Sequence, residues 1–578
     1  MTGKLSAGLT AVATTMLLAV CSHGEQTDLN RSIEPFDMQG FIDHELAEGN
    51  EKVIIPPGRY RVKPKNRQHL ILNGLSGIEI IADGVEMICT ETTRALTIDN
   101  CRDVTVRGLT IDYDPLPYTQ GRIVKMSEDK MAHEIELFDG YPTSEEVQVF
   151  KYEIFRSDTR TLRFGSYHEF EVESLDPKHI RVTKGANYRN STFKPEEIGD
   201  IIAIGTAHAP GGSIPHAVYI NQCVNLKLED VTLYASNCFG FLEVNCDNTT
   251  YLRCKIDRRP PETDLKKRGD ARIRSLNADA FHSKHAIKGP AIIGCTARFQ
   301  GDDCINICGD YHMITASEGK ELRVLAKRNM NIEVGDPVEL LTYQGERLPD
   351  AKVVMITPDG EINDAEKDFL SRQKMNDNLK TNHHGALTRA FKITLDRAVE
   401  LPMGSIICSM RRTGNGFTVK NCDFGYNRSR GILIKASDGE VSGNTLTENW
   451  GEAIKVAPEY WWLESGSSNN VEIKDNIIRD CQSFPIAVYA FGGPLDIAPV
   501  GAHNNITITG NTISDCLLPN ILVTSTKGLK VENNVHKPSK TTDPRPWRLG
   551  QFKLDPEDLK PVMTVNCDDC EIGNNLTK

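Results

Sequence analysis

The sequence has no basic excess, and this absence limits the partners that the protein can have. Lysine and arginine together number 67 against 79 aspartates and glutamates, which gives a formal net charge of -12 at pH 7. Nucleic acids and anionic membranes attract proteins through basic faces. We therefore expect no nucleic-acid partner and a ligand that is neutral or weakly charged.

Long apolar runs are absent beyond the first residues, which argues against a membrane-spanning helix in the rest of the chain. Lys4 precedes an apolar run over 9–20, a pattern that predicts an export signal over residues 1–24. Residues 18–21 resemble a bacterial lipoprotein cleavage box, in which Cys21 would be acylated, and ordinary cleavage near residue 24 is the alternative. We expect a periplasmic or cell-surface protein of a Gram-negative bacterium, or a secreted one, that meets the membrane only through such an anchor.

Paired cysteine motifs are scarce, although the chain has 16 cysteines. Cys254, Cys295 and Cys422 lie in strand-like patterns between apolar neighbours, where a small buried thiol suits the packing. Cys567 and Cys570 form the one CxxC motif, and without a second such pair we expect no zinc site. A local disulfide between these two residues is left open.

Helical periodicity is scarce too, so we expect an all-β fold with short helices over 38–48 and 364–375. One strand-like pattern recurs instead: an apolar residue, two spacers, a small, aliphatic or amide residue, one spacer and a second apolar residue. Its central positions lie 22 or 23 residues apart in pairs such as Cys422 and Asn444. This is the length of one coil of a parallel β-helix, in which stacking of the coils buries the apolar side. The pattern occurs at 106–111, 228–233, 251–256, 419–424, 441–446, 473–478 and 508–513.

Four asparagines occupy the central position of this pattern in the C-terminal half: Asn444, Asn476, Asn511 and Asn534. Stacked amides hydrogen-bond to one another along the axis of such a solenoid. We interpret the four residues as an internal ladder that belongs to the scaffold.

In two segments the repeat is interrupted by stretches in which apolar residues alternate with polar or charged ones, as at 161–164 and 391–395. Such alternation is typical of antiparallel strands with one solvated face. We predict a right-handed parallel β-helix that carries two inserted small antiparallel β-barrels. The expected division is an N-terminal cap with the first coils over 25–120, a barrel over 121–207, central coils over 208–308, a second barrel over 309–407 and C-terminal coils over 408–578.

Two short stretches, 277–282 and 301–306, match each other one coil apart. Asp279 and Asp303 should therefore be neighbours along the axis at about 4.8 Å, with Asp302 as a third carboxylate. Like charges on paired strands destabilise a fold, so a function is expected to justify them. Crowding drives carboxylate pKa values apart and lets one group hold a proton while others stay ionised, as glycoside hydrolysis requires. A calcium site and a solvated acidic turn are the alternatives.

The aspartate motifs carry a resemblance to known enzymes. Residues 277–279 (NAD) and 301–304 (GDDC) resemble the NTD and GDDC motifs of polygalacturonases, the inverting β-helix enzymes of glycoside hydrolase family 28. Most of the chain is similar to glycoside hydrolase family 110, bacterial α-1,3-galactosidases that remove terminal galactose from blood-group-B-type and linear α-galactosyl glycans. The resemblance implies Asp302 as the general acid, Asp279 and Asp303 as bases that activate water, inversion at the anomeric carbon, and neither metal nor cofactor.

The sequence departs from the polygalacturonase pattern at two places. No Gly-His-Gly follows the double aspartate, and residues 430–435 (RGILIK) match the Arg-x-Lys motif only loosely. Both departures argue against a uronic-acid substrate, whose carboxylate needs a fixed cationic clamp.

Further candidates for substrate binding surround the aspartates in the sequence. His282 could bind sugar hydroxyls or tune a carboxylate, or be a structural histidine. Asp310 and His312 could line the rim of a pocket or form a polar turn. Arg430 and Lys435 lie on a later coil and either reach the same face or point into solvent.

A loop-like break at 458–464 adds aromatic and acidic candidates. Trp461 and Trp462 could stack on the apolar face of galactose or simply cover the scaffold. Glu459 and Glu464 could bind its hydroxyls.

The leading hypothesis is an exo-acting, inverting α-1,3-galactosidase whose substrates are oligosaccharides or glycoconjugates with terminal α-1,3-linked galactose. The resemblance favours acceptance of both branched and linear glycans. A polygalacturonase-like endo-hydrolase and a glycan-binding β-helix without turnover are the alternatives. A polysaccharide lyase fits less well, because such enzymes pair an acidic site with a basic residue and we expect no cation beside Asp302.

Overall fold

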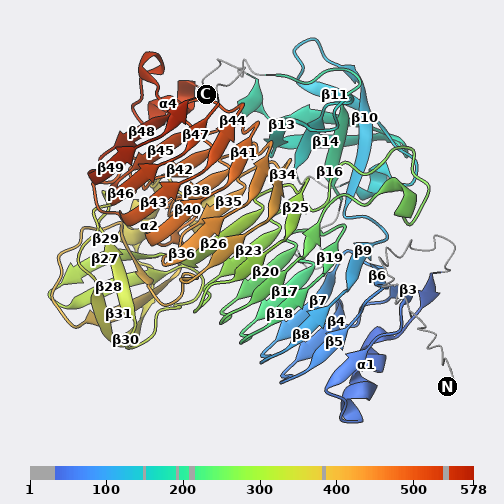
Figure 1. The fold of residues 1–578 in the computed structure, drawn as a ribbon, viewed down its shortest axis with the longest axis horizontal. Coiled ribbons are helices and arrows are strands. Elements are labelled where there is room, and N and C mark those ends of the chain that lie inside the picture. Colours follow the sequence, from blue (N-terminus) through green and yellow to red (C-terminus); the bar gives the residue numbers. More distant parts are fainter. Residues whose placement is uncertain are drawn as a thin grey trace, which may run out of the picture.

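The structure, a computed structural model, describes residues 33–147, 151–189, 194–206, 215–380, 386–537 and 546–577. Three parallel sheets run the length of the solenoid, each made of one short strand per coil (Figure 1). The predicted parallel β-helix is confirmed. The predicted signal segment and Cys21 lie outside the described residues.

Sheet A has thirteen strands in the order β1-β3-β6-β9-β19-β22-β25-β34-β37-β41-β44-β47-β50. Their bounds are β1 Glu34–Pro35, β3 Gly58–Val62, β6 Val85–Cys89, β9 Thr110–Tyr113, β19 Thr232–Leu233, β22 Lys255–Ile256, β25 Thr296–Arg298, β34 Asp423–Gly425, β37 Thr445–Thr447, β41 Ile477–Arg479, β44 Thr512–Ser514, β47 Val535–His536 and β50 Leu576–Thr577.

Sheet B has twelve strands, paired in chain order. Their bounds are β2 Lys52–Ile54, β5 Glu79–Ile81, β8 Thr105–Arg107, β18 Lys227–Glu229, β21 Thr250–Leu252, β24 Ala291–Ile293, β33 Thr418–Lys420, β36 Gly439–Ser442, β40 Asn469–Lys474, β43 His503–Thr509, β46 Thr526–Glu532 and β49 Asp568–Gly573.

Sheet C carries the candidate site. Its parallel strands are β4 Gln68–Asn73, β7 Arg94–Asp99, β17 Val218–Asn221, β20 Phe241–Val244, β23 Phe281–Lys284, β26 Ile305–Asp310, β35 Ile432–Ile434, β38 Ile454–Val456, β42 Ile486–Val488, β45 Ile521–Thr524 and β48 Val562–Val565. A two-residue strand, β39 (Glu464–Ser465), pairs antiparallel with the end of β26.

The interior of the solenoid is one continuous apolar core to which every coil contributes. In sheet C, for example, Phe281, Ile305 and Ile432 are in register on successive strands and point into this core. The short helix α1 (Met38–Ala47) packs its buried Met38 and Ile42 against the first coils, as predicted. Among the described residues no helix is long and apolar enough to cross a bilayer.

The predicted asparagine ladder is present. The Nδ2 group of Asn444 donates to Oδ1 of Asn476 at 2.9 Å, and the same bond links Asn476 to Asn511 and Asn511 to Asn534. All four side chains are buried, so the ladder pairs polar groups that would otherwise destabilise the core. Cys254, Cys295 and Cys422 are buried free thiols, as predicted, and Cys567 and Cys570 are also free.

The two insertions project from opposite sides of the solenoid in Figure 1. The first is an antiparallel sheet of seven strands, β10 Tyr118–Met126, β11 Ala132–Leu137, β12 Tyr152–Phe155, β13 Leu162–Tyr167, β14 Phe170–Asp176, β15 His179–Lys184 and β16 Ile201–Gly205. Its order is β13-β12-β16-β10-β11-β15-β14, so the ladder is open between β13 and β14. The predicted closed barrel is therefore corrected to a sheet whose apolar face still forms one core.

The second insertion is a closed barrel, as predicted, in the order β27-β28-β31-β30-β29-β32. Its strands are β27 His312–Glu318, β28 Glu321–Ala326, β29 Pro337–Leu341, β30 Ala351–Glu361, β31 Arg389–Leu395 and β32 Ser405–Ser409. It also carries the helices α2 (Asp364–Ser371) and α3 (Asp377–Lys380), and a fourth helix, α4 (Pro546–Gln551), lies near the C-terminal coils.

Candidate active site

The three predicted aspartates lie together at the start of two neighbouring strands of sheet C. Phe281 of β23 pairs with Ile305 of β26, and Asp279 and Asp303 each stand two residues before these positions. One carboxylate oxygen from each of Asp279, Asp302 and Asp303 lies within 4.8 Å of the others. We call these three residues the carboxylate cluster.

Asp279 is tied to the histidine that follows it on the same strand. The Nδ1 group of His282 donates to Oδ2 of Asp279 at 2.8 Å, and both residues are buried. Burial lowers the pKa of His282, but the contacts with Asp279 and Cys308 together outweigh burial and raise this pKa to about 10. His282 is therefore an imidazolium that neutralises one carboxylate of the cluster.

Asp302 has two cationic partners that the sequence did not suggest. Lys151, from the first insertion, donates to Oδ2 of Asp302 at 2.9 Å, and Arg428 also pairs with this oxygen. Burial raises the pKa of Asp302, but Arg428 and then Lys151 outweigh it and hold this pKa well below its ordinary value. The expectation of no cation beside Asp302 is wrong, so the acidic site itself does not argue against lyase chemistry.

Asp303 is the carboxyl group that can keep a proton. Its Oδ1 accepts the backbone N–H of Arg430 at 2.8 Å, and its Oδ2 lies 3.1 Å from the guanidinium of the same residue. Burial raises the pKa of Asp303 to about 7, helped by the charges of Asp279 and Asp302 and opposed by Arg430. The resemblance implies Asp302 as the acid, whereas these surroundings favour Asp303.

The loop over residues 458–464 contributes two acidic side chains beside the cluster. Glu459 lies 3.6 Å from the guanidinium of Arg430 and 2.6 Å from Nζ of Lys455. Glu464 lies 2.8 Å from Nζ of Lys435. The structure thus gathers four predicted residues, Arg430, Lys435, Glu459 and Glu464, around the C-terminal side of the cluster.

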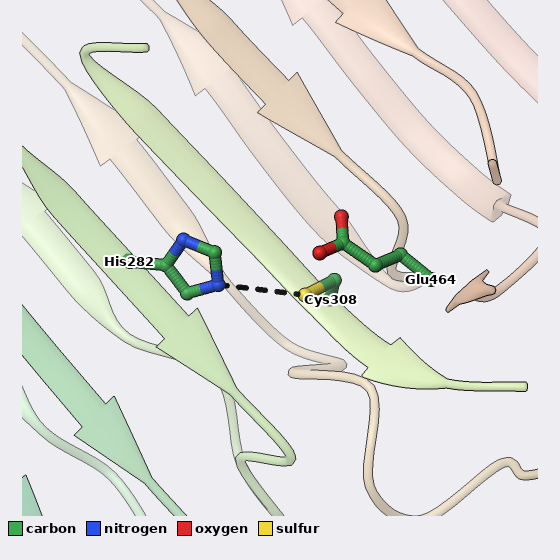
Figure 2. Close-up of side chains that lie close together, drawn as sticks. All are labelled: His282, Cys308 and Glu464. Carbon is green, nitrogen blue, oxygen red and sulfur yellow. Dashed lines mark hydrogen bonds between the residues drawn. The ribbon is translucent and has the colours of Figure 1, made fainter. Parts of the chain in front are cut away.

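The outer face of sheet C also brings together a group with metal-ligand chemistry: His282, Cys308 and Glu464 (Figure 2). Nε2 of His282 faces the thiol of Cys308 at 3.9 Å. Nδ1 of His282 is bonded to Asp279 and Glu464 is already paired with Lys435, so a cation bound here would have to compete with Lys435 for Glu464. Lysine and arginine likewise occupy the oxygens of Asp302 and Asp303, so neither group suits a divalent cation.

Asp310 and His312 are buried at the end of β26 and the start of β27. Asp310 is buried between two lysines and a histidine, with Lys284 at 3.0 Å, Lys327 at 2.7 Å and His285 at 2.9 Å. His312 is fully buried, with Nε2 bonded to Asn331 and Nδ1 accepting the backbone N–H of Lys327. Both residues are therefore buried where the chain passes from β26 into the second barrel, and they do not lie at the rim of a pocket.

Replacing Asp310 with Asn should destabilise the fold rather than alter the chemistry. The change removes the direct ion-pair partner of the buried Lys284 and Lys327, which is expected to cost about 3–5 kcal/mol of unfolding free energy. The measurement is guanidinium unfolding followed by fluorescence. Asp139→Asn, at an exposed surface pair, serves as the control and should leave the transition where it is. An unchanged midpoint for Asp310→Asn would contradict this account.

Trp461 and Trp462 are the most solvent-exposed of the predicted substrate-binding residues. Their side chains are 45% and 40% exposed, on the loop that carries Glu459 and Glu464. Stacking of these rings on a sugar stays a prediction.

The most important residues that the sequence analysis missed come from distant segments. Lys151 also donates to the backbone carbonyls of Asn277 and Gly301, so it bridges both aspartate motifs. His168, from the same insertion, is exposed and lies within electrostatic range of Arg428, Lys151 and Asp302. Neither residue belongs to a motif, so no local signal could have identified it.

Comparisons with known proteins agree with the fold and the motifs. A family model described as "Right handed beta helix region" matches residues 403–536. The chain is 22% identical over 613 residues to Alpha-1,3-galactosidase B of Bacteroides thetaiotaomicron, covering 96% of this chain and 91% of that protein. It is 24% identical over 303 residues to Alpha-1,3-galactosidase A of Shewanella woodyi, covering 51% of this chain and 45% of that protein.

Among solved structures, a family 28 exopolygalacturonase of Yersinia enterocolitica matches with a TM-score of 0.36 at 8% identity, covering 90% of this chain and 73% of that chain. The predicted similarity to bacterial α-1,3-galactosidases over most of the chain is confirmed by the first of these relatives, and the second agrees with it over half of the chain. The chain is a parallel β-helix protein similar, over 96% of its length, to a bacterial α-1,3-galactosidase.

Proposed function

We propose that this protein is an exo-acting glycoside hydrolase that removes terminal α-1,3-linked galactose from branched and linear glycans. The observation that carries the proposal is the carboxylate cluster, in which Asp302 is paired with two cations while the buried Asp303 lies beside Asp279 and Asp302. Asp303 has a pKa raised to about 7, whereas two cations hold Asp302 ionised. Glycoside hydrolysis needs one proton donor and one ionised carboxylate at the same bond. The names of the two curated relatives support galactose as the sugar released.

The reaction is a direct displacement at the anomeric carbon. A water oxygen bonds to that carbon while the bond to the leaving oxygen breaks, and the leaving oxygen takes the proton of the acid. The attacking water gives a proton to an ionised carboxylate. We assign Asp303 as the acid and Asp302, with Asp279 beside it, as the groups that orient and deprotonate the water.

Inversion is part of the proposal and is supported by the resemblance. The cluster oxygens lie within 4.8 Å of one another, which is closer than the spacing of about 6.5–9.5 Å common in inverting enzymes. Direct displacement places the attacking water and the leaving oxygen on opposite faces of the sugar ring, so Asp303 would face the leaving oxygen while Asp302 and Asp279 face the water.

The direct test is proton NMR during hydrolysis of an α-1,3-galactosyl disaccharide. We expect β-galactose as the first product, followed by slow mutarotation, and the same anomer from a branched, fucosylated substrate. Initial α-galactose would show retention and contradict the displacement. New reducing ends from polygalacturonic acid, without galactose release, would support the endo-hydrolase instead.

A further inference from the structure

A cavity of about 290 Å³ adjoins the carboxylate cluster on the side of the C-terminal coils. Ile305, Ile432 and Ile454 are in register on successive strands of sheet C, so Arg430 and Glu452 take the place of Asp303 on the next two coils. Both residues line the cavity. Because neighbouring strands are about 4.8 Å apart, the cavity begins within about one sugar ring of the cluster.

The walls of this cavity combine aromatic rings with polar side chains. Phe552 packs against Phe484 at 5.6 Å and against Tyr489 at 5.1 Å, and all three rings line the space together with Trp450. Gln551, the last residue of α4, is exposed and also lines the cavity. Aromatic faces with a few polar groups are typical of small-ligand sites, and the volume is at the small end of their range of about 300–1,000 Å³.

The charges around the cavity favour a neutral occupant. Arg548 pairs with Glu452 at 2.9 Å, and Lys455 pairs with Glu459 at 2.6 Å. Arg428 is committed to Asp302 in the same way. Since each of these cations already has a carboxylate, an anionic sugar would have to displace one of them, whereas a neutral sugar needs only hydrogen bonds.

On the side of the N-terminal coils the cluster is flanked by stacked rings. His216 stacks on Phe239 at 4.7 Å, and Phe239 stacks on His282 at 4.6 Å, so these three rings lie in a row toward the N-terminal coils. The cavity gives a substrate that places its scissile bond at the aspartates room to extend toward the C-terminal coils.

We propose that this cavity is the subsite for the leaving-group sugar and that residues 548–552 of α4 and its end determine which neutral acceptor ring is accepted. The inference rests on the proposed function. The galactose that is cleaved must touch the aspartates, whereas the cavity reaches them only through Arg428 and Arg430, so it suits the adjacent ring.

The test is to fill the cavity and compare two substrates. Gln551 is exposed, so Gln551→Trp should fold while placing an indole in the subsite. We expect kcat/KM on α-1,3-galactobiose to fall by about tenfold or more, because the acceptor ring loses its binding energy. Hydrolysis of α-galactosyl fluoride, whose leaving group is a single atom, should stay within about twofold of wild type. Lys553→Trp, with the same ring just outside the cavity, is the matched control and should change neither rate.

The outcomes separate this inference from the proposed function. Equal losses on both substrates would mean that the cavity holds the reacting galactose, and no loss on either would mean that it holds no sugar; both results overturn the inference while leaving a galactosidase. A wild-type protein inactive on both substrates would overturn the proposed function itself. As a second measurement, methyl β-galactoside should inhibit hydrolysis of α-1,3-galactobiose competitively in wild type, because both need the cavity, and should inhibit Gln551→Trp at least about tenfold more weakly.

Discussion

The Asp303→Asn variant is expected to lose about 10³-fold in kcat on an α-1,3-galactosyl disaccharide, because the leaving sugar oxygen then departs without a proton. The same variant should keep much of its activity on α-galactosyl fluoride, because fluoride leaves without protonation. The change from a carboxyl to an amide keeps the side-chain shape, so Oδ1 can still accept the backbone N–H of Arg430. Steady-state kinetics on the two substrates measures the effect.

Asp302→Asn is the matched comparison, with the same substitution one residue away. If Asp302 activates water, this variant should lose activity on both substrates by a similar factor. The reverse pattern, with the fluoride spared by Asp302→Asn and not by Asp303→Asn, would restore the roles that the family resemblance implies. Full activity of both variants on the disaccharide would remove the cluster from the mechanism.

The pH dependence of wild type follows from the same assignment. Asp303 acts in its protonated form, and its pKa is raised to about 7, so this form is present below that pH and is lost as the pH rises through it. The rate on the disaccharide should therefore fall above about pH 7. The rate on α-galactosyl fluoride should lack this alkaline decline, since no proton donor is needed.

The solenoid was predictable because its signal repeats. Cys422 and Asn444 are separated by one coil, and in the structure the backbone N–H of Cys422 donates to Oδ1 of Asn444 at 2.9 Å. Each coil is stabilised mainly by its neighbours, so an equivalent side chain recurs at each turn and the spacing is visible in the sequence. The repeat also predicted that Asp279 lies beside Asp303, because the two residues occupy equivalent positions on adjacent coils.

The architecture of the two insertions was less predictable from the sequence than that of the solenoid. Alternating sequence predicted their antiparallel strands, but it does not determine whether the first and last strands of a sheet meet. In the second insertion β27 pairs with β32 and the ladder closes, whereas in the first β13 and β14 each pair on one side only. Closure depends on contacts between whole sheets, which leave no periodic mark in a single sequence.

The electrostatics of the site could not be predicted for a similar reason. The sequence showed three aspartates and left their partners unknown, because Lys151 and Arg428 come from segments more than a hundred residues from Asp302 in the chain. Which carboxyl keeps its proton is decided by those cations and by burial, and not by the order of the residues in the motif.

Lys151→Met is expected to lower kcat by about 10²-fold, the effect of removing one preorganised charge contact from an active site. The lysine binds Asp302 and two backbone carbonyls, so its loss alters both the position and the charge state of that carboxylate. With Arg428 as the remaining cation, the pKa of Asp302 should rise toward its ordinary value. Because Asp302 acts in its ionised form, activity is lost as the pH falls through that pKa, and the acidic limb of the rate profile should move to higher pH.

This shift distinguishes a positioning residue from a merely structural one, since partial unfolding would lower the rate at every pH without moving the limb. Lys151→Arg keeps the charge and should restore the position of the acidic limb even if kcat recovers only in part. Lys178→Met removes an exposed lysine of the same insertion and should match wild type throughout. If the pH profile of Lys151→Met overlays that of wild type, then Lys151 does not govern the ionisation of Asp302, and the first insertion supports the site only by packing against it.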